Sequence, residues 1–177
     1  MKITPIMEKY ILHWGEMGTR WGVNRTVAQI HALLYLSEKP LDAEEITETL
    51  GVARSNVSTS LKELQSWGLV KIVHVMGDRR DHFESLKDLW QISRIIIEER
   101  KKREIDPTIT MLRQCVLDSS DDKLTDKAVK ARIEDTLEFM EMLSEWYLQI
   151  KDIPAPTMTK LMKLGKKITG LLSKMKG

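Results

Sequence analysis

Residues 41–68 constrain the fold more than any other part of the chain, because two helical patterns there flank a single glycine. Asp42 stands where a helix N-cap accepts backbone N–H groups, and Glu45, one turn later, completes a capping box. Gly51 can adopt the left-handed conformation that ends such a helix. The second helical pattern covers residues 53–67 and stops at another glycine. Two helices joined by a tight turn predict a helix-turn-helix.

The second of these helices has two chemically distinct faces. Val57, Leu61 and Leu64 repeat at helical spacing and mark the face expected to be buried. The opposite side carries mainly small polar side chains, and Arg54 lies at the N-terminal end of the helix. Small polar side chains let a helix lie deep in a DNA major groove, where Arg and Asn read guanine and adenine edges. The alternative interpretation is an ordinary solvated face that contains poor helix formers. The candidate DNA-binding residues on this helix are Arg54, Ser55, Asn56, Ser58, Thr59 and Lys62.

A hairpin with arginines at its tip is predicted directly after this helix. Residues 69–75 are rich in β-branched side chains, and residues 81–84 can return as the partner strand. The turn between them contains Asp78, Arg79 and Arg80. A recognition helix followed by such a hairpin is typical of a winged helix. Because the negative potential of a narrow minor groove favours inserted arginine, both arginines are candidate DNA contacts.

The same region resembles a known family. The matching segments include residues 51–58, 61–64, 68–70 and 77–80, and they resemble the winged helix of the MarR superfamily. Residues 14–18, Asn24 and the pair 106–107 are similar to its GbsR-type branch, which is named for glycine betaine synthesis. The resemblance extends over about residues 8–115.

The most specific part of the resemblance is the Asp-x-Arg pattern in the wing. The resemblance implies that Asp78 stabilises the wing and that Arg80 enters the minor groove. The chain departs from the family at Ala53, where a capping Ser or Thr is common. We therefore expect either a later helix start, at Ser55, or a first turn that contacts DNA phosphate.

The length of 177 residues fits one domain with an extension, and three parts are expected in a mainly α fold. Residues 1–23 should form an N-terminal helix that packs on the core or on a dimer partner, and the glycines at 15, 18 and 22 should end it. Residues 24–86 should form the winged helix-turn-helix with its small β-hairpin wing. Residues 87–177 should form an α-helical dimerisation region with a possible effector site.

Capping signals predict where the helices after the wing begin. Ser85 and Asp88 form a capping pair for a helix that should end near Arg103. Asp106 followed by Pro107 has the pattern of a new N-terminus. Cys115, the only cysteine, excludes an intrachain disulfide, and we expect a buried, inert thiol in a reducing cytoplasm.

A long helix near the C-terminal end is the main candidate for dimerisation. Its apolar residues alternate steps of four and three, which is the pattern of a coiled-coil seam. A helix buried within one subunit is the alternative. The candidate dimer-interface residues are Tyr10, Trp14, Val129, Ile133, Met140, Leu143, Tyr147 and Ile150. A final basic amphipathic helix, residues 161–175, is expected to pack on the dimer rather than to lie on a membrane.

The pattern of residues excludes the common catalytic sites. The chain has neither a phosphate-binding glycine loop nor a nucleophile elbow, and its histidines and single cysteine lack metal-ligand spacing. We expect no cofactor, no metal site and no enzymatic activity, and His31 should be a core or interface residue. The net charge of +2 excludes a polycation that coats nucleic acid, so DNA affinity must come from locally arranged charge.

These observations predict a cytoplasmic, homodimeric, sequence-specific transcription regulator, expected to be a repressor, that reads a pseudo-palindromic DNA operator. The alternative is a winged helix used as a protein-interaction module. The resemblance also implies a small-molecule effector, for which choline or a related osmoprotectant is the candidate. Aromatic side chains that could form a cage for such a cation are Tyr10, Trp14, Trp21, Trp90, Trp146 and Tyr147, although aromatics at helical spacing are more often core residues.

Overall fold

The structure, a computed structural model, describes residues 3–164 and divides into two compact units. The first unit is Met1–Ile97 and the second is Glu98–Gly177. In the described part of the chain, no helix is long and apolar enough to cross a membrane. Each unit is described separately below.

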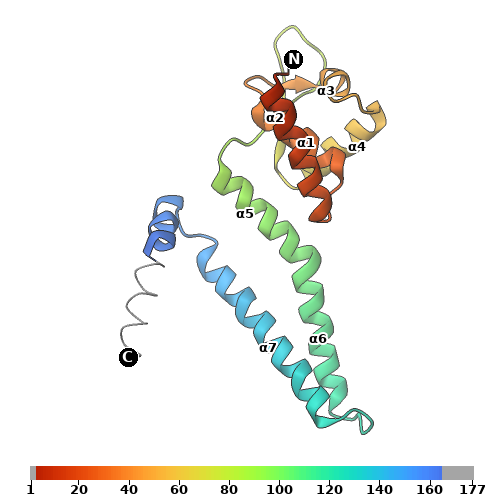
Figure 1. The fold of residues 1–177 in the computed structure, drawn as a ribbon, viewed down its shortest axis with the longest axis vertical. Helices are drawn as coiled ribbons and strands as arrows, with labels where there is room; N and C mark the ends of the chain where they lie inside the picture. The colour runs from red at the N-terminus through yellow and green to blue at the C-terminus, as the bar shows by residue number, and fades with distance from the viewer. Residues whose placement is uncertain (1–2, 165–177) are drawn as a thin grey trace. The chain divides into compact units, whose positions relative to one another are not determined.

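The first unit contains the winged helix (Figure 1). Its elements are α1 (Pro5–Arg20), α2 (Arg25–Leu36), β1 (Leu41–Asp42), α3 (Ala43–Leu50), α4 (Arg54–Ser66), β2 (Val70–Val73), β3 (His82–Ser85) and the first part of α5 (Leu89–Arg100). The second unit continues from α5 through η1 (Lys101–Ile105), α6 (Asp106–Ser119), α7 (Lys127–Ile150) and a helical segment at residues 155–164. The expected mainly α fold with a small β wing is confirmed.

The helix-turn-helix forms for the local reasons expected. The Asp42 carboxylate accepts backbone N–H groups from Glu44 and Glu45, and the Glu45 carboxylate accepts the N–H of Asp42. Gly51 ends α3 with φ 63°. These contacts confirm the predicted capping box and glycine turn.

The sheet has one strand more than the sequence predicted. The three strands are antiparallel in the order β1-β3-β2, and β1 pairs Leu41 with Phe83 and Asp42 with His82. A strand of two residues has no detectable alternation, so sequence patterns could not reveal it. Its consequence is that the N-cap of α3 lies beside the base of the wing.

Helix α2 lies at the centre of the first unit. Ile30, Leu33 and Leu34 are fully buried, and α2 contacts α1, α3, α4 and β3. The predicted buried face of α4 is also confirmed, since Val57 and Leu61 belong to the same core. This packing holds α4 on the surface of the core.

The expectation that Gly15 and Gly18 help to end the N-terminal helix is wrong. Helix α1 continues through Gly15 and Gly18 to Arg20, and only Gly22, with φ 73°, lies in a turn. A Cβ added at Gly18 would lie 2.5 Å from the Cβ of Ala28. The glycines therefore allow α1 to approach α2 closely, and this contact compensates for their low helix propensity.

Gly18→Ala should lower the free energy of unfolding by about 1 kcal/mol, because overpacking against Ala28 outweighs the better helix propensity of alanine. Chemical denaturation measures the change. Adding Ala28→Gly removes the methyl group that the new Cβ meets, so the double variant should be more stable than Gly18→Ala alone. A double variant without this recovery would contradict the explanation.

The helices after the wing also differ from the prediction. Ser85 lies in β3, and the N-cap of α5 is Asp88, which accepts N–H groups from Trp90 and Gln91. Helix α5 does not stop near Arg103. It passes through the π-helical turn η1 into α6, and Asp106 has helical dihedral angles instead of capping a new helix. Proline lacks an N–H and crowds the carbonyl one turn before it, so the wider π turn accommodates Pro107 without ending the helix.

In the second unit, α6 and α7 pack together and leave much apolar surface exposed. Arg113 of α6 forms an ion pair with Glu141 of α7 at 2.7 Å. No residue of α7 is buried within the single chain. Cys115 is half-buried, and its Sγ lies 3.5 Å from Sδ of Met111, so the expected fully buried thiol is wrong. Of the predicted final helix, residues 165–175 lie outside the described residues.

Candidate nucleic-acid interface

The recognition helix presents the predicted polar residues on its open face. Five of the six candidates are exposed and Ser58 is half-buried. Ala53 is the N-cap residue and makes no side-chain hydrogen bond, so the missing cap inferred from the sequence is confirmed. The candidates exposed on α4 are Arg54, Ser55, Asn56, Thr59 and Lys62.

The wing is organised by one aspartate–arginine pair. The Arg80 side chain donates to Asp78 from Nε to Oδ1, at 3.0 Å, and from Nη2 to Oδ2, at 2.6 Å. The backbone N–H of Arg80 also donates to Asp78 Oδ1 at 3.0 Å. Hydrogen bonds from Arg80 hold the pKa of the Asp78 carboxyl well below its usual range, and the same pairing raises the pKa of Arg80. The pair therefore remains charged at all physiological pH values.

Arg80 also connects the wing to the helix-turn-helix. Its Nη1 lies 2.5 Å from Oδ2 of Asp42, whose side chain is almost fully buried. Burial alone would raise the pKa of Asp42, but hydrogen bonds from the Glu45 and Glu44 backbone, together with the charge of Arg80, hold that pKa below its usual value. The sequence showed Asp42 only as a helix cap, because residues distant in the chain give no local signal of an ion pair.

A cleft of about 400 Å³ lies between α4 and the wing. Arg54, Lys62 and Arg80 bring positive charge to it, whereas Asp42, Glu44 and Asp81 line it with negative charge. The exposed Arg79 does not line this cleft, and the described residues offer its side chain no hydrogen-bonding or ionic partner. The exposed face of α4, with Arg54 and Lys62, is the part of this surface that can accept a polyanion.

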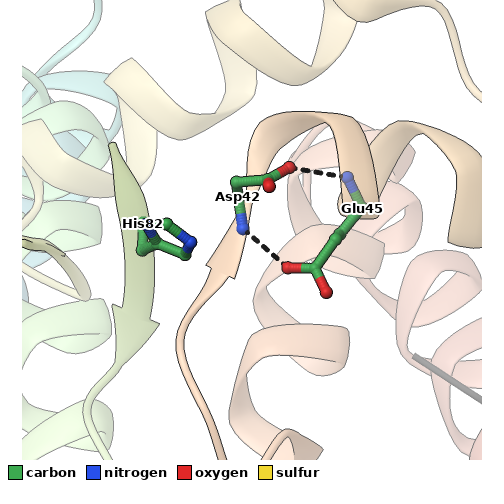
Figure 2. Close-up of side chains that lie close together, drawn as sticks. All are labelled: Asp42, Glu45 and His82. Carbon is green, nitrogen blue, oxygen red and sulfur yellow. Dashed lines mark hydrogen bonds between the residues drawn. The ribbon is translucent and has the colours of Figure 1, made fainter. Parts of the chain in front are cut away.

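Asp42, Glu45 and His82 lie close enough to resemble a metal-binding group, with ligand atoms within 4.8 Å of one another. Figure 2 shows the capping hydrogen bonds that occupy this cluster. Asp42 also pairs with Arg80, Glu45 pairs with Lys39, and the Nδ1 atom of His82 lies 3.0 Å from the Arg80 carbonyl oxygen. These contacts give the cluster a structural role.

Comparisons with known proteins agree with this geometry. Residues 21–81 match the model of the MarR family. The winged helix therefore resembles that of the MarR family. The putative HTH-type transcriptional regulator YvaV of Bacillus subtilis (strain 168) is 23% identical over 129 residues, which are 71% of each chain. The HTH-type transcriptional repressor GbsR of the same organism is 24% identical over 98 residues, 55% of this chain and 54% of GbsR.

The fold comparison leads to the same architecture. A solved crystal structure of a transcriptional regulator has a TM-score of 0.63, with 15% identity over 83% of this chain and 96% of that one. The family and these relatives are transcription regulators, not enzymes, as the sequence predicted.

The candidate dimer residues lie in both units. In the first unit, the rings of Tyr10 and Trp14 stack with their centroids 5.4 Å apart. The other six lie on α7 in the second unit. Ile133, Met140, Tyr147 and Ile150 are half-buried, whereas Val129 and Leu143 are exposed. The large side chains of Phe139, Met142 and Trp146 are still more exposed in the single chain.

A second, smaller pocket of about 60 Å³ lies in the first unit. Trp14, Trp21 and Trp67 line it together with His31, whose Nε2 is buried without a hydrogen-bond partner. Burial, and then the charge of Lys87, lowers the pKa of His31 to about 4, so its ring is neutral. Of the predicted aromatic cage, Trp14 and Trp21 line this pocket and Trp90 does not. Trp67, whose role the sequence did not reveal, completes the group.

Proposed function

We propose that this chain acts in the cytoplasm as a dimeric repressor that reads a pseudo-palindromic operator with α4 and the wing. The observation that carries the proposal is the exposed polar face of α4, with Arg54 and Lys62, beside a wing that carries the exposed Arg79 and Arg80. An α-helix of this kind fits a major groove, and a hairpin beside it can reach the neighbouring minor groove. Repression is supported by the 24% identity to the repressor GbsR.

The exposed candidate residues of α4 have separate roles in this proposal. Ser55, Asn56 and Thr59 contact base edges, and Lys62 contacts phosphate or guanine. Arg54 and the uncapped first turn of α4 lie against phosphate, where unpaired N–H groups favour an anion.

The two wing arginines contribute differently. Arg79 has no partner among the described residues and contacts the DNA backbone or the minor groove with its whole guanidinium group. Arg80 uses three of its five N–H groups within the protein, so two N–H groups remain for the minor groove. Asp78 keeps Arg80 in this orientation.

Dimerisation is supported by the apolar surface of α7. Trp146 is 58% exposed and Phe139 54% exposed in the single chain, and a second copy would remove such side chains from water. The candidate interface residues on α7, with Tyr10 and Trp14 of α1, belong to this proposal. Sedimentation equilibrium measures the mass of the protein in solution. A monomeric mass throughout the micromolar concentration range would contradict dimerisation.

The test of DNA reading is binding of the purified protein to DNA from beside its own gene across a salt series. We expect tight binding to one fragment, with a decrease of at least about 100-fold between about 50 and 200 mM salt, because phosphate neutralisation releases counterions. A protein-interaction module would instead bind every fragment weakly and show no such slope. Weak binding without a salt slope would contradict the regulator proposal and favour a protein-interaction module.

An effector pocket is a second part of the proposal. The partnerless Nε2 of His31 and the three tryptophans favour a small ligand in the pocket of the first unit, and aromatic faces attract cations such as choline. The pocket volume of about 60 Å³ is below that of a typical ligand site, so we expect lining side chains to move when choline binds. Choline is titrated against tryptophan fluorescence, and a flat response at millimolar choline would exclude it.

A further inference from the structure

Asp42 connects the helix-turn-helix to the wing, two parts of the proposed DNA-binding surface that are distant in the sequence. Its carboxylate is the N-cap of α3, the first helix of the helix-turn-helix, and also the partner of Arg80 in the wing. We propose that Asp42 is a positioning residue for operator reading, which holds Arg80, and with it the wing, at a fixed distance from α3 and α4. This inference rests on the proposed DNA-binding function.

The two oxygens of Asp42 have separate partners. Oδ1 accepts the N–H groups of Glu44 and Glu45, both at 2.8 Å. Oδ2 lies 2.5 Å from Nη1 of Arg80. One oxygen therefore stabilises the helix and the other holds the wing. Because Asp42 is only 2% exposed, water competes little for either interaction.

Arg80 can make this connection because its guanidinium group is a rigid, planar fork. Nε and Nη2 face Asp78 within the wing, and Nη1 points to Asp42. Its side chain remains 58% exposed, so it can contact DNA without leaving either carboxylate. A lysine ammonium group is a compact point charge and cannot span the two carboxylates in this way.

The wing has few other attachments. Strand β1 contributes only two residue pairs to β3, and residues 74–81 lie beyond the paired strands. Among the hydrogen bonds and ion pairs that these turn residues make with the described part of the chain, the ion pair from Arg80 to Asp42 is the one that leaves the hairpin. Without this ion pair, the wing should move relative to α4.

Asp42→Asn tests the inference, because asparagine is as good an N-cap as aspartate but carries no charge for Arg80. Removal of a negative charge near DNA raises affinity for any sequence, so a matched control is needed. Glu44→Gln removes the same charge from an exposed neighbour that lines the same cleft and makes no ion pair or hydrogen bond with Arg80.

Two affinities are measured for each variant, one for the operator and one for random-sequence DNA of the same length. Glu44→Gln should raise both affinities equally and leave their ratio unchanged. Asp42→Asn should lower the ratio of operator to random affinity by about 10-fold, since only the operator requires a correctly placed wing. An unchanged ratio in Asp42→Asn would overturn the inference.

Hydrogen exchange of residues 74–81 gives a readout that does not require DNA. Exchange should become faster in Asp42→Asn and stay at the wild-type rate in Glu44→Gln. Equal exchange in all three proteins would overturn the inference even if the operator is bound. If the wild type itself does not distinguish operator from random DNA, the proposed function fails, while faster exchange in Asp42→Asn would still establish that Asp42 positions the wing.

Discussion

Replacing Lys62 and Arg80 together with alanine should lower the affinity for the operator by about 100-fold at low salt. Both side chains line the cleft between α4 and the wing, and they approach different grooves in the proposed complex. Each variant subunit lacks one cation of the recognition helix and one of the wing, and a dimer therefore lacks two of each. The slope of log affinity against log salt should become shallower by about 1 for every phosphate that is no longer neutralised.

The control for this experiment is Lys9→Ala combined with Lys123→Ala, which removes two exposed cations distant in sequence from the recognition helix and wing. Net charge changes equally in the two double variants, so a difference in affinity reports the position of the charges. The decrease in affinity of Lys62→Ala/Arg80→Ala should be largest for operators flanked by A·T pairs, whose narrow minor groove attracts Arg80. Equal affinities in the two variants would show that DNA, if bound, contacts another surface.

Lowering the pH from 7 to 5 should reduce the stability of the first unit by about 2 kcal/mol through His31 alone. Its pKa is about 4 in the folded state and returns to the ordinary histidine value of 6.5 when the chain unfolds. The unfolded state therefore binds a proton first as the pH falls, and folding loses stability progressively between about pH 6.5 and 4. The physical cause is burial of the ring, with the charge of Lys87 as a smaller contribution.

His31→Leu removes the ionisable group from a similar volume and should flatten this pH dependence. Denaturant unfolding of both proteins at several pH values measures the difference. The carboxyls of Asp42, Glu45 and Asp78 have lowered pKa values, so the stability they contribute is lost only at more acidic pH. If wild type and His31→Leu lose the same stability between pH 7 and 5, the burial of a neutral His31 is not the cause.

Much of the structure of the first unit could be predicted from residues that lie close together in the sequence. The capping box of Asp42 and Glu45, the left-handed Gly51 and the buried face of α4 all depend on residues within one or two helical turns. The arginine-tipped hairpin was also predicted, because β-branched strands on both sides of a glycine-containing turn pair locally. The small polar residues on the open face of α4 then predicted that this helix binds DNA.

Other features were decided by packing between distant segments. Gly18 is expected to break a helix when the sequence is considered alone, yet contact with Ala28 of α2 keeps α1 helical. The pocket beside His31 is lined both by Trp67, at the end of α4, and by Trp14 of α1, which are distant in the sequence. Neither feature leaves a periodic pattern in the sequence.

Asp42 has one role that the sequence predicted and another that only the tertiary structure revealed. Its sequence context determined that it caps α3, because the N–H groups that it accepts follow it in the chain. Its pairing with Arg80 depended on the two-residue strand β1 meeting β3, which brings the wing to the start of the helix-turn-helix. Local hydrogen bonds are set by neighbouring residues, whereas an ion pair between distant residues requires the folded core to bring its two ends together.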